Sequence, residues 1–433
     1  MKTVFVESFG CRASQADGAA IEESLREHGF TPVREAGAAE LIVLNTCTVT
    51  HSAEVDARRM IRGMQRRSPQ AQILVTGCYA QRAPEELSAL EGVRWVVGNS
   101  HKTQIAEIVA HAAEEYHGRV LVSAMAQEKQ FRAGAVRAVR EDRTRPNLKV
   151  QDGCSNRCAF CIIPAVRGSS RSAALESVVA QMRDLAERYA EVVLSGINLG
   201  RWGRDLAGGL RFVDLLGAVL RETAVQRVRI SSIEPMDWNE DLLRLVANQP
   251  RIAKHVHMPL QSGSDAVLKR MFRKYRTRHY ASRMEMARRF LSEAAIGADV
   301  MTGFPGETDA EFEETVRFIE DQPFTYLHVF TYSERPGTTA AAMAGAVPAR
   351  VRQERTRVLR ELGERKNLEY RKRMVGRTLS AVTLEERGFA LTTNFLKVEM
   401  ATVKDPNSIV DVTIGGVWAR GLRERGAGVF PIL

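Results

Sequence analysis

Three closely spaced cysteines, in the run Cys154-Ser-Asn-Arg-Cys158-Ala-Phe-Cys161, constrain this chain more than any other feature of its 433 residues. Three thiolates at this spacing can hold three irons of a four-iron, four-sulfur cube and leave the fourth iron open to a small molecule. A structural zinc site is the alternative, but zinc takes four ligands and no fourth Cys or His stands near in the sequence. The spacing therefore predicts a cluster that carries out chemistry, and the chain is expected to be an enzyme.

The other three cysteines, Cys11, Cys47 and Cys78, each end an apolar run within the first eighty residues. Such runs, separated by helix-like stretches at 15–28 and 52–67, predict parallel strands of an open α/β sheet. Because the carboxyl ends of parallel strands meet at one edge, the three thiols are expected to converge there. Each could instead be a small buried hydrophobe or a disulfide partner, but three equivalent positions favour a second three-cysteine cluster.

Two three-cysteine sites in this order resemble the radical S-adenosylmethionine (SAM) methylthiotransferases. The resemblance covers nearly the whole chain and rests on Asn45-Thr-Cys-Thr-Val-Thr50, Thr76-Gly-Cys-Tyr-Ala-Gln81, Gln151-Asp-Gly-Cys154, Ile162-Ile-Pro-Ala-Val-Arg-Gly168, Ser195-Gly-Ile-Asn-Leu-Gly200, Ser231-Ser-Ile-Glu-Pro235, Pro259-Leu-Gln-Ser-Gly-Ser264 and Gly303-Phe-Pro-Gly-Glu-Thr308. It implies a [4Fe-4S] cluster with bound SAM on the SAM triad, Cys154, Cys158 and Cys161. It also implies a second [4Fe-4S] cluster on the auxiliary triad, Cys11, Cys47 and Cys78.

The wording of 45–50 and 195–200 is most similar to the MtaB branch, which attaches a methylthio group to C2 of N6-threonylcarbamoyladenosine at position 37 of transfer RNA. The resemblance implies that a radical from SAM removes hydrogen from C2, that the auxiliary cluster carries the sulfur, and that a second SAM supplies the methyl group. The implied partners are the tRNA anticodon stem-loop, an electron donor such as flavodoxin or ferredoxin, and a candidate sulfur donor.

Two alternatives to this function stay open. The first is another methylthiotransferase branch, acting on isopentenyladenosine of tRNA or on a ribosomal protein aspartate. The second is a non-catalytic, metal-stapled RNA-binding protein. Lys and Arg number 62 against 52 Asp and Glu, a net charge of +10, which suits a polyanionic partner but also an ordinary solvated surface.

The chain is expected to divide into four segments. These are an N-terminal methylthiotransferase domain over 1–125, a basic linker over 126–145, a radical SAM domain over 146–374 that ends in a basic helix at 350–373, and an RNA-binding TRAM domain over 375–433. No apolar stretch approaches the roughly 20 residues that cross a bilayer, so no membrane contact and a cytoplasmic location are expected.

Alternating strands and helices define the expected central fold. Strands at 148–150, 191–194, 227–230, 255–258, 297–301 and 327–330, each followed by a helical pattern, predict a parallel sheet similar to the open six-strand barrel of radical SAM enzymes. Short alternating runs at 378–383, 394–400 and 409–414 predict a small β-barrel that resembles the TRAM module. The predicted class is α/β with this small barrel at the end.

Contacts to SAM are carried over from the family by position, because active groups lie at the carboxyl ends of such strands. The expected SAM-binding residues are Phe160, Ser195, Gly196, Asn198, Ser231, Ser232, Glu234, Gln261, Ser262 and Phe304. The expected contacts to RNA phosphates are Lys397, Arg420 and Arg423. No side chain is expected to act as an acid or base, since the clusters carry the chemistry. Capping and turn roles are the competing interpretation for the polar residues, and packed, hydrogen-bonded roles are expected for His255 and His257.

Overall fold

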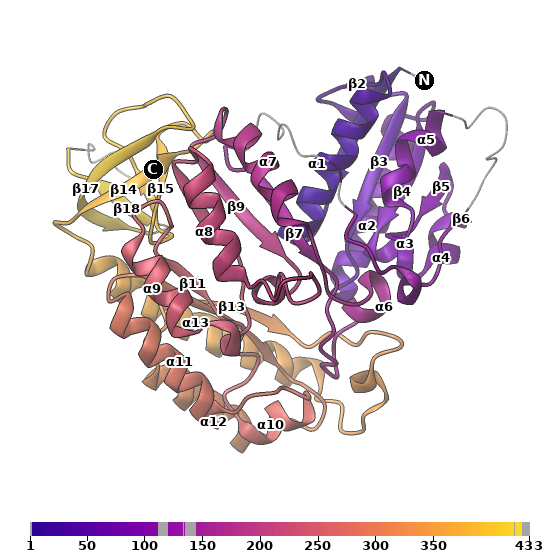
Figure 1. The fold of residues 1–433 in the computed structure, drawn as a ribbon. Coiled ribbons are helices and arrows are strands. Elements are labelled where there is room, and N and C mark those ends of the chain that lie inside the picture. Colours follow the sequence, from indigo (N-terminus) through magenta and orange to yellow (C-terminus); the bar gives the residue numbers. More distant parts are fainter. Residues whose placement is uncertain (1, 111–119, 133, 135–143, 420, 427–433) are drawn as a thin grey trace, which may run out of the picture.

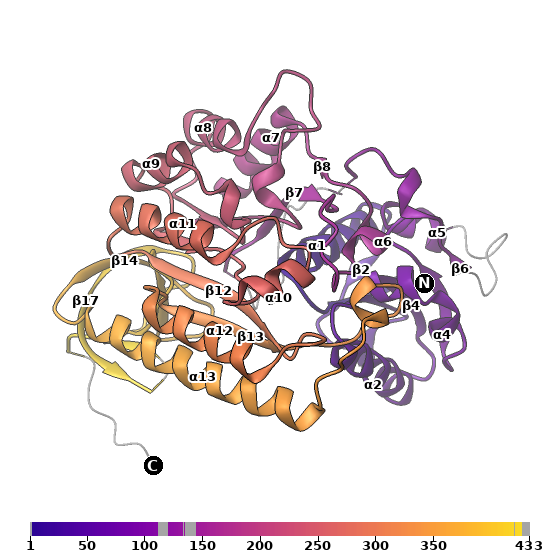
Figure 2. The same ribbon diagram turned by 90° about the horizontal axis from the view of Figure 1, so that it is seen from below.

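Three sheets and one closed barrel organise the part of the chain that the computed structural model describes, residues 2–110, 120–132, 134, 144–419 and 421–426. The first sheet and the closed barrel lie on opposite sides of a central α/β unit in both views (Figures 1 and 2). Among the described helices, none combines the length and the apolar character needed to cross a bilayer. The predicted fold class is confirmed.

The first unit is a parallel sheet with strand order β2-β1-β3-β4-β5-β6. Its strands are β1 (Thr3–Ser8), β2 (Thr31–Pro32), β3 (Leu41–Thr46), β4 (Gln72–Gly77), β5 (Val93–Val97) and β6 (Val120–Leu121). Its helices are α1 (Arg12–Glu27), α2 (His51–Arg67), α3 (Cys78–Arg82), α4 (Pro84–Ser88) and α5 (Ile105–Ala110). Val4 packs with α1 and α5, whereas the next residue, Phe5, packs with α2 on the other face. Both faces are covered, which explains why the strands are apolar throughout.

The central unit contains all six strands that the sequence predicts. They are β7 (Asn147–Asp152), β9 (Glu191–Gly196), β10 (Arg227–Ile230), β11 (His255–His257), β12 (Ala295–Thr302) and β13 (Tyr326–Thr331). The first three pair in parallel in one sheet and the last three in another, and a parallel bridge between Val228 and Ile252 connects the two. A short strand that was not predicted, β8 (Arg171–Ser172), pairs antiparallel with β7.

Helices cover the outside of the central unit (Figure 2). They are α7 (Leu175–Ala186), α8 (Phe212–Glu222), α9 (Glu240–Asn248), α10 (Asp265–Arg270), α11 (Thr277–Phe290), α12 (Asp309–Asp321) and α13 (Ala349–Lys372). Helix α6 (Ile163–Arg167) instead packs against α3 of the first unit. The start of α12 is a capping box, in which Thr308 accepts from the backbone of Glu311 and the Glu311 carboxylate accepts from the backbone of Thr308. The predicted basic helix at 350–373 corresponds to α13.

The C-terminal barrel is closed by five strands in the order β14-β15-β16-β18-β17. They are β14 (Thr378–Thr383), β15 (Phe389–Thr392), β16 (Lys397–Glu399), β17 (Ile409–Trp418) and β18 (Gly421–Glu424). The strand predicted at 394–400 is shorter, because the chain turns at Phe395, whose φ is +63°. The Phe395 ring stacks on His255 of β11 at a centroid distance of 4.3 Å, so it fastens this barrel to the central unit.

Helix α1 joins the first unit to the central one through a buried group of five charged side chains (Figure 1 shows α1 beside β7). Asp17 of α1 accepts from Lys102 at 2.8 Å, from Arg167 at 3.0 Å, and from Lys149 of β7. Asp152 at the end of β7 accepts from Lys149 and from Arg167, each at 2.9 Å. Every side chain in this network is at least 91% buried, so its internal pairing decides how the two units dock.

Asp17→Asn is expected to destabilise the docked chain, because three buried cations would then share one carboxylate. Breaking a buried ion pair on one side costs about 3–5 kcal/mol. The measurement is the free energy of unfolding by denaturant, with Asp56→Asn on the exposed face of α2 as the matched control. Equal stability of the two variants would show that the network does not hold the units together.

Candidate functional site

The auxiliary triad lies at the carboxyl ends of three neighbouring strands. Cys11 is the N-cap of α1 after β1, Cys47 directly follows β3, and Cys78 follows β4 as the first residue of α3. Strands β1, β3 and β4 are adjacent in the sheet, so the fold brings the three thiols to one edge. Burial, followed by the neighbouring Cys78 thiol, raises the pKa of Cys47 to about 12.

A glycine in the left-handed region precedes three of the six cysteines. The φ angles are +101° at Gly10, +95° at Gly77 and +68° at Gly153. A Cβ atom on Gly10 would lie 2.8 Å from the Cβ of Cys47, so only glycine lets the Cys11 loop approach the neighbouring strand end. The geometry of the auxiliary triad thus depends on Gly10, a residue that has no side chain to bind a metal.

The SAM triad lies on the loop between β7 and α6. The sulfur of Cys154 accepts from the backbone N–H of Asn156 at 3.4 Å and from the Asn198 side chain at 3.5 Å. The sulfur of Cys158 accepts from Nη1 of Arg273 at 3.2 Å. Burial raises the pKa of Cys161 to about 12, so a metal that binds here must displace thiol protons.

Neither triad has the spacing of a site for one metal ion. Within the described residues, the Cys, His, Asp and Glu groups with three ligand atoms all within 4.8 Å of one another comprise His257, Asp299 and His328, and neither cysteine triad is among them. At least one pair of sulfurs in each triad therefore lies farther apart than the about 3.8 Å expected of thiolates on one tetrahedral zinc with Zn–S bonds of about 2.3 Å.

Helix α6, which follows the SAM triad, also contacts the auxiliary triad. Arg167, six residues after Cys161 at the end of α6, donates from Nε to the sulfur of Cys78 at 3.2 Å. Asn99 donates both to that sulfur, at 3.5 Å, and to the Val166 carbonyl, at 2.8 Å. Sequence analysis did not single out Arg167, Asn99 or Arg273 as site residues. The Ile162–Gly168 motif contains the first of them and is the signal that could have identified it.

Two of the predicted SAM-binding residues carry buried oxygen atoms without a hydrogen-bond partner. These atoms are Oδ1 of Asn198 and Oγ of Ser231. Unsatisfied buried polar atoms cost free energy, so both are suited to a bound ligand. The Asn198 backbone is held by Gln151, whose side-chain oxygen accepts its N–H at 2.6 Å. Gly196 faces the same glutamine, because a Cβ at Gly196 would lie 3.0 Å from the Cβ of Gln151.

The other predicted SAM-binding residues have partners within the protein. Ser195 donates weakly to the Leu148 carbonyl, and Ser232 forms a hydrogen bond with the His257 ring. Glu234 accepts from Arg273 at 2.6 Å, and Ser262 forms a hydrogen bond with Thr315 of α12. The backbone of Gln261 has a φ of +67°. The Ser262 side chain is fully buried, which matches its competing role in capping and turns. Phe304 and Phe160 join one apolar cluster beside the triad with Ala159 and Tyr332. Their contacts to SAM remain predictions.

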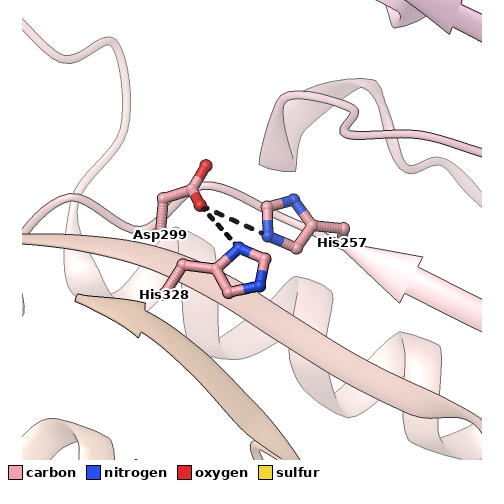
Figure 3. A group of neighbouring side chains, drawn as sticks. All are labelled: His257, Asp299 and His328. Atoms are coloured by element: carbon pink, nitrogen blue, oxygen red, sulfur yellow. Dashed lines mark ion pairs between the residues drawn. The ribbon is translucent and has the colours of Figure 1, made fainter. Parts of the chain in front are cut away.

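A histidine–aspartate–histidine group lies on β11, β12 and β13. Figure 3 shows that both imidazole rings face one carboxylate oxygen of Asp299, at 3.5 Å from His257 Nε2 and 3.3 Å from His328 Nδ1. Although burial opposes it, hydrogen bonding from the two histidines lowers the pKa of Asp299 below its ordinary range. The other ring nitrogen of His257 lies 2.7 Å from the Ser232 hydroxyl, and His255 Nε2 lies 2.6 Å from the Tyr326 hydroxyl. Both expected histidine roles are therefore seen.

The predicted RNA contacts lie on the C-terminal barrel. Lys397 pairs with Glu386 at 2.5 Å and lies 4.1 Å from the Phe389 ring centroid, and Arg423 pairs with Glu399 at 2.9 Å. Arg420 lies outside the described residues. An RNA phosphate at Lys397 or Arg423 would thus compete with a carboxylate that is already in place.

The family models match two parts of the chain. Residues 3–98 match the model described as uncharacterized protein family UPF0004, and residues 148–319 match the radical SAM superfamily. Among solved structures, the radical S-adenosylmethionine methyltransferase TsrM from Kitasatospora setae is similar with a TM-score of 0.59 and 16% identity, over 79% of this chain and 77% of that one. That likeness concerns the fold alone. Together with the SAM triad, the superfamily match defines a radical SAM enzyme.

Curated relatives narrow this class. The Threonylcarbamoyladenosine tRNA methylthiotransferase MtaB of Aquifex aeolicus is 36% identical over 96% of this chain and 100% of its own length. The protein of the same name in Bacillus subtilis is 37% identical over 94% and 92%. A tRNA-2-methylthio-N(6)-dimethylallyladenosine synthase of Streptomyces viridosporus is 33% identical over 89% and 77%. This chain belongs to the radical SAM methylthiotransferase family, and membership of the radical SAM superfamily implies SAM and a [4Fe-4S] cluster as cofactors.

Arg273→Met is expected to make the reduction potential of the SAM-triad cluster more negative. The substitution removes a positive charge and a hydrogen bond to the Cys158 sulfur, and both stabilise the reduced cluster. A redox titration followed by electron paramagnetic resonance measures the shift, with Lys274→Met, an exposed neighbour, as the control. Equal potentials in the two variants would mean that the Arg273 contact has no influence on the cluster.

Proposed function

We propose that this protein is the tRNA methylthiotransferase that converts N6-threonylcarbamoyladenosine at position 37 to its 2-methylthio derivative. The observation that carries the proposal is the meeting of two three-cysteine sites around α6, with Arg167 contacting Cys78 six residues after the last ligand of the other triad. The substrate is inferred from relatives of 36% and 37% identity that are named threonylcarbamoyladenosine methylthiotransferases and match over nearly their full length.

We further propose that the auxiliary triad binds a second [4Fe-4S] cluster. When bound, the two clusters and SAM supply the electron, the hydrogen-removing radical and the sulfur. The chain contributes ligands and surroundings: Arg273 and Asn198 donate to the sulfurs of the SAM triad, and Arg167 and Asn99 donate to Cys78. Phe160 and Phe304 provide an apolar wall that excludes water from a reactive species.

The proposed partners are the anticodon stem-loop of tRNA, an electron donor such as flavodoxin or ferredoxin, and a sulfur donor, in the cytoplasm. Part of the positive charge on α13 is already paired, because Arg355, Arg357, Arg365 and Lys372 each contact a carboxylate. The net charge of +10 and the C-terminal barrel support RNA as the substrate over a protein. The base at position 37 must turn out of the stacked anticodon loop to reach the triads, as target bases do in other modifying enzymes.

Removing one triad is expected to remove one cluster only. The variant with Cys11, Cys47 and Cys78 replaced by alanine should hold about four irons per chain after anaerobic reconstitution, and so should the variant lacking the SAM triad, against about eight in the unaltered protein. Iron and sulfide analysis provides the count. Four irons in the unaltered protein, or zinc in place of iron at the auxiliary triad, would refute the second cluster.

Expression in a host without methylthiotransferases tests the substrate. Mass spectrometry of tRNA nucleosides is expected to reveal a methylthio adduct on threonylcarbamoyladenosine with the intact gene and none with Cys161→Ala, because that substitution removes a ligand of the SAM-binding cluster. An adduct on the isopentenyl nucleoside would assign the chain to the sister branch. No nucleoside adduct at all would point to a protein substrate or to binding without turnover.

A further inference from the structure

The side chain of Arg12 belongs to the first unit, faces charged groups of the central unit and forms no ion pair among the described residues. Arg12 follows the auxiliary-triad residue Cys11 and begins α1, which packs against β7 and β9. Its Nη1 atom is buried and has no hydrogen-bond partner. Its electrostatic neighbours are two cations, Arg145 and Arg229, and two groups on the barrel strands, Tyr326 and Glu191.

Glu191 is the carboxylate in this group, and other arginines occupy it. Arg229 binds it from Nε at 2.7 Å and from Nη2 at 3.1 Å. Arg145 lies 3.3 Å from it and Arg227 lies 3.8 Å from it. Among the described residues, three arginines therefore pair with Glu191, and Arg12 forms no ion pair with it. A partly buried cation without an ion pair is unfavourable until an anion arrives.

Tyr326, one of these neighbours of Arg12, is surrounded by polar groups of the central unit. Tyr326 stacks near His255, His257 and His328, with ring centroids 5.2 to 5.9 Å away. Tyr326 and His328 also line an open cavity of about 1220 Å³ between β13, α13 and the C-terminal barrel.

We propose that Arg12 is the recognition residue for the carboxylate of the threonylcarbamoyl group. This assignment rests on the proposed function, since it takes that substrate as given. A guanidinium binds a carboxylate through two parallel N–H···O bonds, which gives both charge and orientation. An adenosine that carries an uncharged N6 substituent leaves Arg12 unpaired and is disfavoured. Because Arg12 adjoins Cys11, the residue that reads the substituent is fixed to a ligand of the auxiliary site.

Three anticodon stem-loops separate charge recognition from general RNA binding. They carry threonylcarbamoyladenosine, its neutral methyl ester, or unmodified adenosine at position 37. Binding to the reconstituted protein is measured without reductant, so that no turnover occurs. The unaltered protein is expected to bind the carboxylate form at least about tenfold more tightly than the other two. Arg12→Gln should abolish this preference without changing the affinity for the ester and the unmodified loop, and Arg12→Lys should retain part of it.

Arg26→Gln, at the exposed end of the same helix, is the matched control and should leave all three affinities unchanged. In the absence of RNA, Arg12→Gln is expected to melt at the same temperature as the unaltered protein or higher, because it removes a partly buried charge that has no ion pair. Iron content verifies that the adjacent Cys11 site still assembles. A lower melting temperature together with equal losses on all three loops would assign Arg12 a structural role and overturn the inference.

Failure of the inference and failure of the proposed function give different results. If the unaltered protein modifies threonylcarbamoyladenosine and Arg12→Gln retains the same preference for its carboxylate, the Arg12 assignment is wrong and the function stands. If the unaltered protein does not prefer the carboxylate form and methylthiolates the isopentenyl nucleoside instead, the proposed substrate is wrong, and the Arg12 assignment is overturned with it.

Discussion

The buried network of Asp17, Asp152, Lys102, Lys149 and Arg167 is the constraint on which the rest of the site depends. Three cations and two carboxylates leave one positive charge in excess. Arg167 directs its Nε to the sulfur of Cys78, so a thiolate there completes the balance. The energetics of docking and of metal binding at the auxiliary triad are thus coupled, because each supplies charge that the other requires.

The same logic orders the strands around the two triads. Parallel strands place their carboxyl ends along one edge, and here two different sheets present such edges to each other across α1 and α6. Each sheet carries three cysteines on connections that follow its strands. Neither sheet alone could surround a substrate, since the residues that contact the auxiliary sulfur include Arg167 from the second unit. The reactive region is therefore a property of the assembled chain.

The sequence predicted the parts of the fold that have strong periodicity. These parts could be predicted because apolar runs and strand ends are local signals; they are the six central strands, helix α13 and the convergence of Cys11, Cys47 and Cys78. The strands that were not predicted are short or lack a distinctive pattern; they are β2, β5, β6, β8, β15 and β18. The contacts of Arg167 and Arg273 could not be predicted for another reason: each joins residues far apart in the sequence, and a lone arginine has no spacing that marks its partner.

The left-handed turn at Phe395 gives the C-terminal barrel a second use. Its ring lies on His255 and beneath Arg229, whose guanidinium also bonds the carbonyls of Thr392 and Thr393. The C-terminal barrel therefore covers part of the central unit as well as providing an outer surface. A chain without the C-terminal barrel would expose the part of the central unit that this barrel covers. Reduced activity after such a deletion would therefore reflect water entering the central unit as much as weaker binding of RNA.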